Sequence, residues 1–574
     1  MSKWNFLFVF FTLFAIGLVF YFPMLRFGLT SDHLEAIYEW RGRFIVPSIN
    51  SFKAFINPYG ASALLDKIID WVWGFNPLPY FLIAYITKIF ASTSLYALSK
   101  YVFRSRIIAI TTSVASLLLF AGIQATVPGA TIYISLTLFC LGLLNLFKKY
   151  REPQTVSTKS SLVISLLFIA SFAITPARMY GIIPMLFFIE VYSLILRNTK
   201  LTQVVVRLGF FFIVFLLFKR IGLIDSYGTA TGVASAVTSI SYYQKIANLP
   251  GQLVFMLASF FQTFFPDIFV KVIAQLGYVL HLTRTTVFLV SLIPGVILFR
   301  VIQRSSTLPK FWSLISILFH SALVLVLINN LSSIDVYTQI TIYLGGIIAN
   351  ALFYILVTLI YTKHKLSTLS IGVFGAPLIF MFVPYLLYPL ETQETLSRYF
   401  AASSFFGAII SGIIIYIIRQ KNLRFGTIAL GVWFLILFYN GMLIHNYYVS
   451  AGEDGTYQKY LSSTFNVMNS EIGSRHGKSR PLVFIRGDSP NFISTTILNQ
   501  GSLRFSLTND DLSENSQPIF ITDLKKLELI YTNKAREPYK NVTDINAVYG
   551  FEVKDKKVYS ITPEIRAYLL KVTR

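Results

Sequence analysis

The sequence has few of the residues on which soluble enzymes build metal or nucleotide sites. It contains a single cysteine, Cys140, which cannot form a disulfide within the chain. CxxC, HExxH and Walker-type motifs are absent, and no GxGxxG run stands between a strand and a helix. We therefore predict no metal site and no cofactor, and the sequence leaves a dependence on divalent metal ions open.

Charged residues are also scarce. They make up 13% of the 574 residues, against 55% hydrophobic residues, and the mean hydropathy is +0.64, which excludes an ordinary soluble domain. A membrane-spanning helix needs about 20 predominantly apolar residues. By that criterion we predict an α-helical polytopic membrane protein with about 13 spans, at residues 5–25, 78–99, 107–123, 130–147, 160–175, 179–197, 204–224, 285–302, 311–330, 338–361, 369–388, 400–418 and 425–444.

Charges between the spans indicate the orientation of the chain. Residues 1–444 hold 32 Lys and Arg against 12 Asp and Glu, and every second connection is basic, including the one with Arg197, Lys200 and Arg207. Cytoplasmic loops collect Lys and Arg in this way. We therefore expect a cytoplasmic N-terminus, an extracytoplasmic C-terminal segment, and no nucleic-acid partner for the net charge of +23.

The same rule separates two domains and one irregular segment. Residues 1–444 form the predicted membrane domain, with residues 26–77 as its first extracytoplasmic loop. Residues 225–284 would invert the basic loops if they crossed once, so we expect them to be re-entrant or interfacial, with a break at Pro266 and Asp267; two short crossings are the alternative.

Residues 445–574 are charged and rich in turns, and they predict a small extracytoplasmic α/β domain. PLVFIRG and PIFITD are typical of buried strands, FEVKDKKVYSIT of a hairpin that turns near Asp555 and Lys556, and TYQKYLSSTFNVMNSEIG of a helix. The domain has no catalytic constellation. We expect it to bind the acceptor or to cap the membrane cavity.

Some ionisable residues fall near the middle of predicted spans, where charge is costly. Lys88 and Glu190 lie at a similar depth below the outer face, so we expect a buried structural ion pair between them in preference to a proton relay. His320 is expected to be a hydrogen-bonded core histidine in preference to a ligand.

The run TSDHLEAIYEW places acidic residues just beyond the first span. Asp32 is the candidate base that deprotonates an acceptor hydroxyl, and Glu35 is the alternative base. His33 follows Asp32 directly, and Glu39 follows one helical turn after Glu35. The competing interpretation is the solvated face of an interfacial helix.

Cations mark the same membrane face. Arg178 lies between the fifth and sixth spans, Lys219 and Arg220 near the outer end of the seventh, and Arg398 with Tyr399 at the start of the twelfth. Such groups neutralise a departing phosphate, and arginine binds its oxygens in bidentate fashion. The alternative is that each one anchors its helix at the interface by reaching the lipid headgroups.

At these residues the sequence resembles the GT-C family of membrane glycosyltransferases. TPARMYGIIPMLFFIEVY is similar to a charged turn followed by a proline-containing helix in many members, and SRYFAASSFFGAII is similar to the Glu-Arg-Tyr-Leu-Tyr-Leu-Pro-Ser segment of the protein O-mannosyltransferase-like branch. The resemblance implies that Asp32 acts as the base or positions the acceptor, and that Arg398 and Tyr399 form the Arg-Tyr pair of the family. His33 stands where many members have a second acid, and Ser397 where the segment has Glu.

The function expected from these patterns is transfer of a sugar from a polyprenyl-phosphate donor to a hydroxyl on a glycan, a lipid or a protein, at the extracytoplasmic face of the membrane. A polymerase or ligase of lipid-linked glycans is a close alternative, because it uses the same type of donor. A non-enzymatic transporter or flippase of envelope glycans is the alternative from another class.

Overall fold

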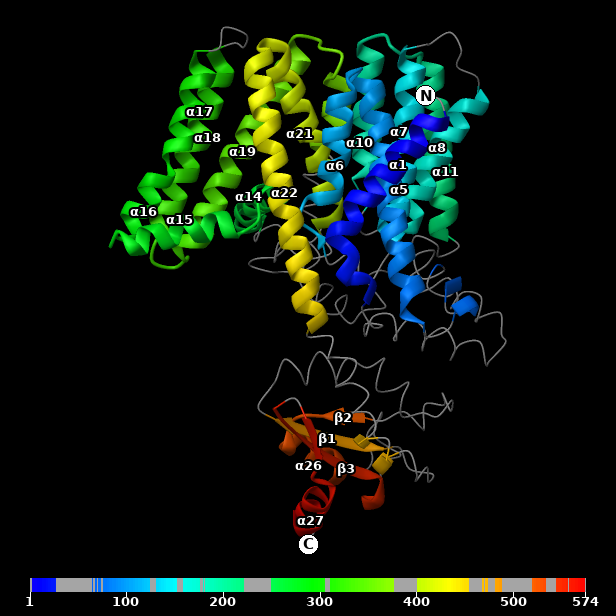
Figure 1. Ribbon diagram of the computed structural model, residues 1–574, viewed down its shortest axis with the longest axis vertical. Helices are drawn as coiled ribbons and strands as arrows, with labels where there is room; N and C mark the ends of the chain where they lie inside the picture. The colour runs from blue at the N-terminus through cyan, green and yellow to red at the C-terminus, as the bar shows by residue number, and fades with distance from the viewer. Residues whose placement is uncertain are drawn as a thin grey trace. The chain divides into compact units, whose positions relative to one another are not determined.

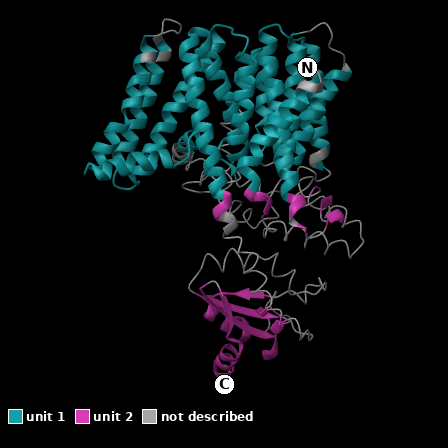
Figure 2. Cartoon of the chain, in the orientation of Figure 1, with its two compact units in different colours: residues 1–22, 56–62, 81–447 teal, residues 23–55, 63–80, 448–574 magenta. Residues whose placement is uncertain are grey.

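The computed structural model describes residues 3–26, 65, 68–69, 71–73, 76–123, 131–151, 158–175, 179, 181–220, 249–304, 310–375, 400–453, 467–468, 470–472, 481–487, 519–532, 544–555 and 557–572. The chain divides into two compact units (Figure 2). Unit 1 comprises Met1–Phe22, Ile56–Ser62 and Phe81–Tyr447, and unit 2 comprises Pro23–Phe55, Ala63–Tyr80 and Tyr448–Arg574.

Unit 1 is a bundle of helices that run side by side through most of its height (Figure 1). Its helices, wholly or for most of their length, are α1 (Lys3–Tyr21), α5 (Pro77–Phe103), α6 (Arg106–Leu118), α7 (Thr131–Arg151), α8 (Thr158–Ile174), α10 (Ile182–Ile195), α11 (Leu201–Arg220), α14 (Leu249–Phe264), α15 (Ile268–Val279), α16 (Arg284–Ser291), α17 (Ile293–Gln303), α18 (Lys310–Asn329), α19 (Val336–Tyr361), α21 (Ala401–Lys421) and α22 (Leu423–Glu453). A further helix occupies residues 367–375. The 3-10 helix η1 (Phe22–Arg26) follows α1 in the chain, and all of it except Phe22 belongs to unit 2.

Six helices of the described chain are long and apolar enough to cross a membrane: Phe6–Arg26, Leu78–Phe103, Thr131–Arg151, Val336–Tyr361, Ala401–Lys421 and Leu423–Ser450. Shorter apolar helices coincide with five more predicted spans: Arg106–Leu118, Lys159–Ile174, Ile182–Ile195, Leu201–Leu217 and Leu314–Asn329. The class of multi-pass membrane protein is confirmed. The count of 13 crossings and the cytoplasmic position of the N-terminus stay predictions.

Two breaks interrupt the helices between residues 249 and 303. α14 and α15 meet at an angle of 101°, and the bend contains Pro266 and Asp267, the two residues at which the sequence predicts an interruption. The predicted span at residues 285–302, in contrast, is two helices that meet at Leu292. Pro294 explains this break, because proline lacks the backbone N–H that a continuous helix needs and fits the first turn of α17.

Small residues allow the helices of unit 1 to approach closely. A Cβ atom at Gly345 on α19 would overlap the carbonyl oxygen of Leu257 on α14, and one at Gly412 on α21 would overlap the hydroxyl of Thr112 on α6. On α8, Ser171 donates a hydrogen bond of 2.7 Å to the carbonyl oxygen of Ser135 on α7. These contacts are typical of membrane helices, which associate through close packing and interhelical hydrogen bonds.

The described C-terminal part of unit 2 is an α/β sandwich. Its sheet has the order β2-β1-β3-β4, formed by β2 (Ile519–Ile521), β1 (Leu482–Gly487), β3 (Val548–Lys554) and β4 (Lys557–Ser560). β1 is parallel to both of its neighbours, and β3 and β4 form an antiparallel hairpin. The predicted strands are therefore present, and Asp555 turns the hairpin with a φ of +50°.

Helices cover both faces of this sheet because the buried strands alternate their side chains. Leu482 and Phe484 pack with α26 (Leu524–Thr532) and α27 (Thr562–Val572) on one face. Val483 and Ile485 pack on the other face with Met468, which lies in the predicted helix. Neither α26 nor α27 was predicted from the sequence.

Candidate functional site

Most of the predicted site residues lie outside the described residues. This applies to Asp32, Glu35, Arg178, Arg398 and Tyr399. Lys219 and Arg220 end α11; the side chain of Lys219 is not described, and that of Arg220 is exposed. The convergence of these residues on one cavity therefore stays a prediction.

Unit 1 contains a buried lysine. Lys88 lies on α5 and is 4% exposed. Its ammonium group donates a hydrogen bond of 2.5 Å to the hydroxyl of Tyr21, the last residue of α1. The same nitrogen lies 4.6 Å from the centre of the Tyr21 ring and 5.3 Å from that of Tyr133 on α7. The cation is thus enclosed by one hydroxyl and two aromatic rings.

The neighbouring residues hold Tyr21 in place. The Tyr21 hydroxyl donates to the carbonyl oxygen of Leu117 on α6, at 2.8 Å. One turn before Lys88, the hydroxyl of Tyr85 donates to the carbonyl oxygen of Phe14. Gly17 permits this approach of α1 to α5, because a Cβ there would lie 2.8 Å from the Tyr85 hydroxyl oxygen.

Three helix ends place this cluster on one side of the membrane. Tyr21 ends α1, Leu117 lies in the last turn of α6, and Tyr133 lies in the first turn of α7. The loop charges predict that all three of these ends face the extracytoplasmic side. α5 has 27 residues and is about 40 Å long, longer than the hydrocarbon core of about 30 Å. Lys88 is therefore expected in the outer half of the membrane, on the side of the predicted acidic loop.

Within the described part of the chain, Lys88 makes no ion pair with a carboxylate. The tyrosine rings offset part of its charge through cation–π attraction, and Tyr21 accepts one of its three N–H donors. A buried cation in a membrane protein usually faces a partner, a cavity or a substrate path. The arrangement suits an anion other than the carboxylates of the described residues.

The acid expected to pair with Lys88 has a different partner. Glu190 on α10 accepts hydrogen bonds from Arg207 on α11, 2.5 Å from Nε to Oε1 and 2.6 Å from Nη2 to Oε2. Both side chains are almost completely buried. The predicted Lys88–Glu190 ion pair is therefore wrong, because the short connection from α10 to α11 brings Glu190 and Arg207 together in a helical hairpin.

This pair also corrects the count of loop cations. Arg207 is not in a loop but inside α11, where Nη2 also donates a 3.0 Å hydrogen bond to Thr199. Arg197 and Lys200 remain in the connection between α10 and α11. The connection is still basic, so the predicted orientation does not depend on Arg207.

Two further residues capable of metal or acid-base chemistry, His320 and Cys140, lie on described helices. The predicted core histidine, His320, is confirmed as hydrogen bonded, with its Nε2 atom 3.3 Å from the Tyr343 hydroxyl. Cys140 is buried. Among the described residues, no group of three or more His, Cys, Asp or Glu side chains could hold a metal ion.

Sequence reasoning missed Tyr21 and Tyr133 as neighbours of Lys88. Tyr21 and Lys88 are 67 positions apart in the chain, and depth along a helix does not indicate which neighbour a side chain faces. The sequence could have indicated such neighbours. A lysine inside a span, with no acid near it in the sequence, is expected to contact polar or aromatic side chains on other helices.

No family model matches the chain, and no curated protein matches it. Among solved structures, the chain is similar to the crystal structure of ArnT from Cupriavidus metallidurans bound to undecaprenyl phosphate. The likeness covers 96% of this chain and 94% of that one, at 10% identity and a TM-score of 0.32. The function is therefore inferred from the residues of this chain and their contacts.

Proposed function

We propose that the protein is a GT-C-type membrane glycosyltransferase, which transfers a sugar from a polyprenyl-phosphate donor to an acceptor hydroxyl on the extracytoplasmic face. The observation that carries this proposal is the buried ammonium group of Lys88, which has no carboxylate partner in the described chain. The resemblance of the outer-face segments to GT-C enzymes supports the same function.

Lys88 supports a lipid-phosphate donor for an electrostatic reason. A lone cation in a low-dielectric region attracts an anion more strongly than a cation in water does. A polyprenyl phosphate brings its anion to the membrane on a hydrocarbon tail, so it can approach a site in the outer half of the bilayer. Tyr21 and Tyr133 would hold the ammonium group ready for that anion.

The chemistry divides between a base and several cations. The acceptor oxygen attacks the anomeric carbon, the bond from that carbon to the phosphate oxygen breaks, and the polyprenyl phosphate leaves with an additional negative charge. Lys88, Arg178 and Arg398 are proposed to stabilise this charge. Asp32 is proposed to take the acceptor proton, with Glu35 as the alternative base.

Three further residues complete the proposed donor site. Lys219 and Arg220 would contact the phosphate from the end of α11, and Tyr399 would follow Arg398 at its edge. The acceptor is a glycan, a lipid or a protein, and membrane lipids surround the site.

The test measures sugar transfer by membranes that contain the full chain. Membranes are incubated with a radiolabelled polyprenyl-phosphate sugar, and incorporation is compared among wild type, Lys88→Met, Lys88→Arg and the control Lys271→Met, which removes an exposed cation from α15. We expect Lys88→Met to lower the rate about 100-fold, Lys88→Arg to retain part of it, and the control to match wild type. Wild-type transfer by Lys88→Met would exclude Lys88 from donor binding.

Asp32 requires its own variant. Asp32→Asn is expected to keep expression and membrane insertion while losing transfer, because the amide cannot accept the acceptor proton. Full transfer by this variant would eliminate Asp32 as the base and leave Glu35. Transfer of preassembled blocks instead of single sugars would identify a polymerase or ligase, and translocation without transfer would identify a transporter or flippase.

A further inference from the structure

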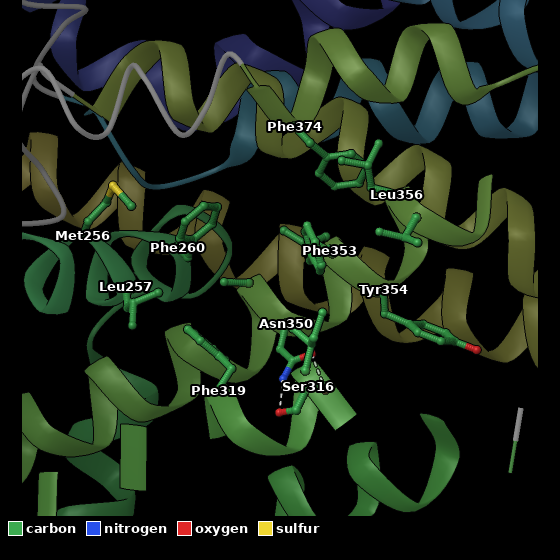
Figure 3. A pocket seen from close by; sticks show the side chains of 14 residues that line it. Met256, Leu257, Phe260, Ser316, Phe319, Asn350, Phe353, Tyr354, Leu356 and Phe374 are labelled. Atoms are coloured by element: carbon green, nitrogen blue, oxygen red, sulfur yellow. Dashed lines mark hydrogen bonds between the residues drawn. The ribbon is translucent and has the colours of Figure 1, made fainter. Parts of the chain in front are cut away.

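A cavity of about 450 Å³ lies inside unit 1, among α14, α18, α19 and the helix at residues 367–375 (Figure 3). Aromatic and aliphatic side chains form most of its wall, among them Met256, Phe260, Phe319, Phe353 and Phe374. None of the described residues that line it is charged. Its volume is within the range of ordinary ligand sites.

Two polar residues of the wall, Ser316 and Asn350, are hydrogen bonded to each other. The Ser316 hydroxyl donates a 2.7 Å hydrogen bond to Oδ1 of Asn350, and Nδ2 of Asn350 donates to the carbonyl oxygen of Ser316 at 3.4 Å. Figure 3 shows this pair at one side of the cavity. A sugar or a phosphate would find too few partners here to replace its water. The cavity therefore fits a hydrocarbon chain.

One wall of the cavity is buried and another faces the surroundings of the bundle. Met256, Phe260 and Phe374 are buried, whereas Phe319 is 40% and Phe353 48% exposed. Phe319 and Phe353 belong to the apolar helices α18 and α19, whose surroundings are the hydrocarbon of the bilayer. A lipid chain can therefore enter from the side, past these two rings.

Basic residues lie beyond the end of α19 that is nearer to the cavity. The lining extends along α19 to Val357, four residues before the helix ends at Tyr361, a distance of about 6 Å. Lys363 and Lys365 follow at once and are both exposed. The hydrocarbon site thus has cations at the position where the headgroup of a bound lipid would lie.

We propose that the cavity binds an acyl chain of an anionic glycerophospholipid, whose phosphate lies against Lys363 and Lys365. The polyprenyl-phosphate donor is the weaker candidate, because the proposed transfer occurs at the opposite membrane face, where α1 and α6 are predicted to end. This proposal does not depend on the glycosyltransferase function.

Native mass spectrometry of the purified full chain tests the headgroup preference. Phosphatidylglycerol and phosphatidylcholine are titrated separately. Two juxtamembrane lysines, at about 1 kcal/mol each, correspond to roughly 30-fold tighter binding of the anionic lipid. The double variant Lys363→Gln, Lys365→Gln should reduce phosphatidylglycerol binding to the phosphatidylcholine level, whereas Lys271→Gln should not. Equal binding of both lipids by wild type would overturn the headgroup assignment.

The cavity itself is tested by filling it and by labelling it. Ala349→Trp places an indole in the cavity and should remove binding of both lipids, whereas Val432→Trp, on a lipid-facing site of α22 that is 51% exposed, should not. A phosphatidylglycerol with a diazirine in its acyl chain should label residues 315–319 and 349–357 of the unmodified protein. This second measurement does not depend on the folding of a variant.

Three results would overturn the assignment of the occupant. Lipid retention by a folded Ala349→Trp variant would mean that the chain lies elsewhere. Diazirine labels confined to other helices would mean the same. Displacement of bound phosphatidylglycerol by an equal concentration of polyprenyl phosphate would assign the cavity to the isoprenoid chain of the donor.

Discussion

Removal of the Glu190 carboxylate should destabilise unit 1 through the cation that it leaves behind. In Glu190→Gln, the guanidinium of Arg207 stays 3% exposed inside the helical hairpin but loses the carboxylate that neutralises it. The retained amide oxygen can accept one of the two hydrogen bonds at 2.5 and 2.6 Å, while the amide nitrogen faces a second donor. Glu190→Gln therefore removes the negative charge of residue 190 and changes the size of its side chain very little.

The magnitude follows from the burial of both partners. Hydrogen bonds to charged groups contribute about 1.5–3 kcal/mol each, and loss of one member of a buried pair costs about 3–5 kcal/mol. Replacement of both members by apolar residues of similar size should restore much of this loss, because no uncompensated charge remains. We therefore expect Glu190→Gln to cost about 3 kcal/mol or more, and the double variant Glu190→Met, Arg207→Met to cost less.

The assay is the free energy of unfolding of the full chain in mixed micelles, followed by tryptophan fluorescence during titration with a denaturing detergent. A double-mutant cycle between Glu190 and Arg207 should give a coupling energy above about 2 kcal/mol, and a matched cycle between Glu190 and Lys88 should give less than about 0.5 kcal/mol. A Glu190–Lys88 coupling larger than the Glu190–Arg207 coupling would refute the assignment of partners.

Two further predictions concern packing in each unit. Gly345→Leu should destabilise unit 1 by about 1–3 kcal/mol or more in the same assay, because its Cβ would overlap the carbonyl oxygen of Leu257, whereas Gly209→Ala, with nothing within 4 Å of its Cβ, should be neutral or stabilising. In unit 2, Thr562→Val removes a 2.7 Å hydrogen bond to Glu471 and should cost about 1–2 kcal/mol, seen as faster proteolysis of the C-terminal part in the full chain.

Local sequence patterns predicted the elements of the fold well. Long apolar runs such as the one at residues 400–418 became helices because a spanning segment must satisfy its backbone internally. PLVFIRG and PIFITD became strands because their apolar side chains fill both faces of a small sheet. The division at Leu292 was missed, because the apolar run continues through it and only Pro294 marks the break.

The sequence patterns did not predict which side chains of neighbouring helices contact each other. The depth of Lys88 and Glu190 in the membrane can be predicted from their distance to the ends of the spans. Depth does not specify the direction in which a side chain points around its helix. Packing of α10 against α11 decided that Glu190 meets Arg207. In the same way, Tyr21 approaches Lys88 because Gly17 lets α1 lie close to Tyr85.

The two buried cations among the described residues of unit 1 therefore have different expected roles. Arg207 has a bidentate carboxylate and a threonine hydroxyl, so its charge is compensated within the fold and its loss should affect stability. Lys88 has a hydroxyl and aromatic rings as partners but no acid among the described residues. These partners offset only part of the free energy that is needed to bury its charge. If that cost is retained for anion binding, Lys88→Met should keep or raise the free energy of unfolding while sugar transfer falls. A loss of stability equal to that caused by Arg207→Met would instead make Lys88 structural.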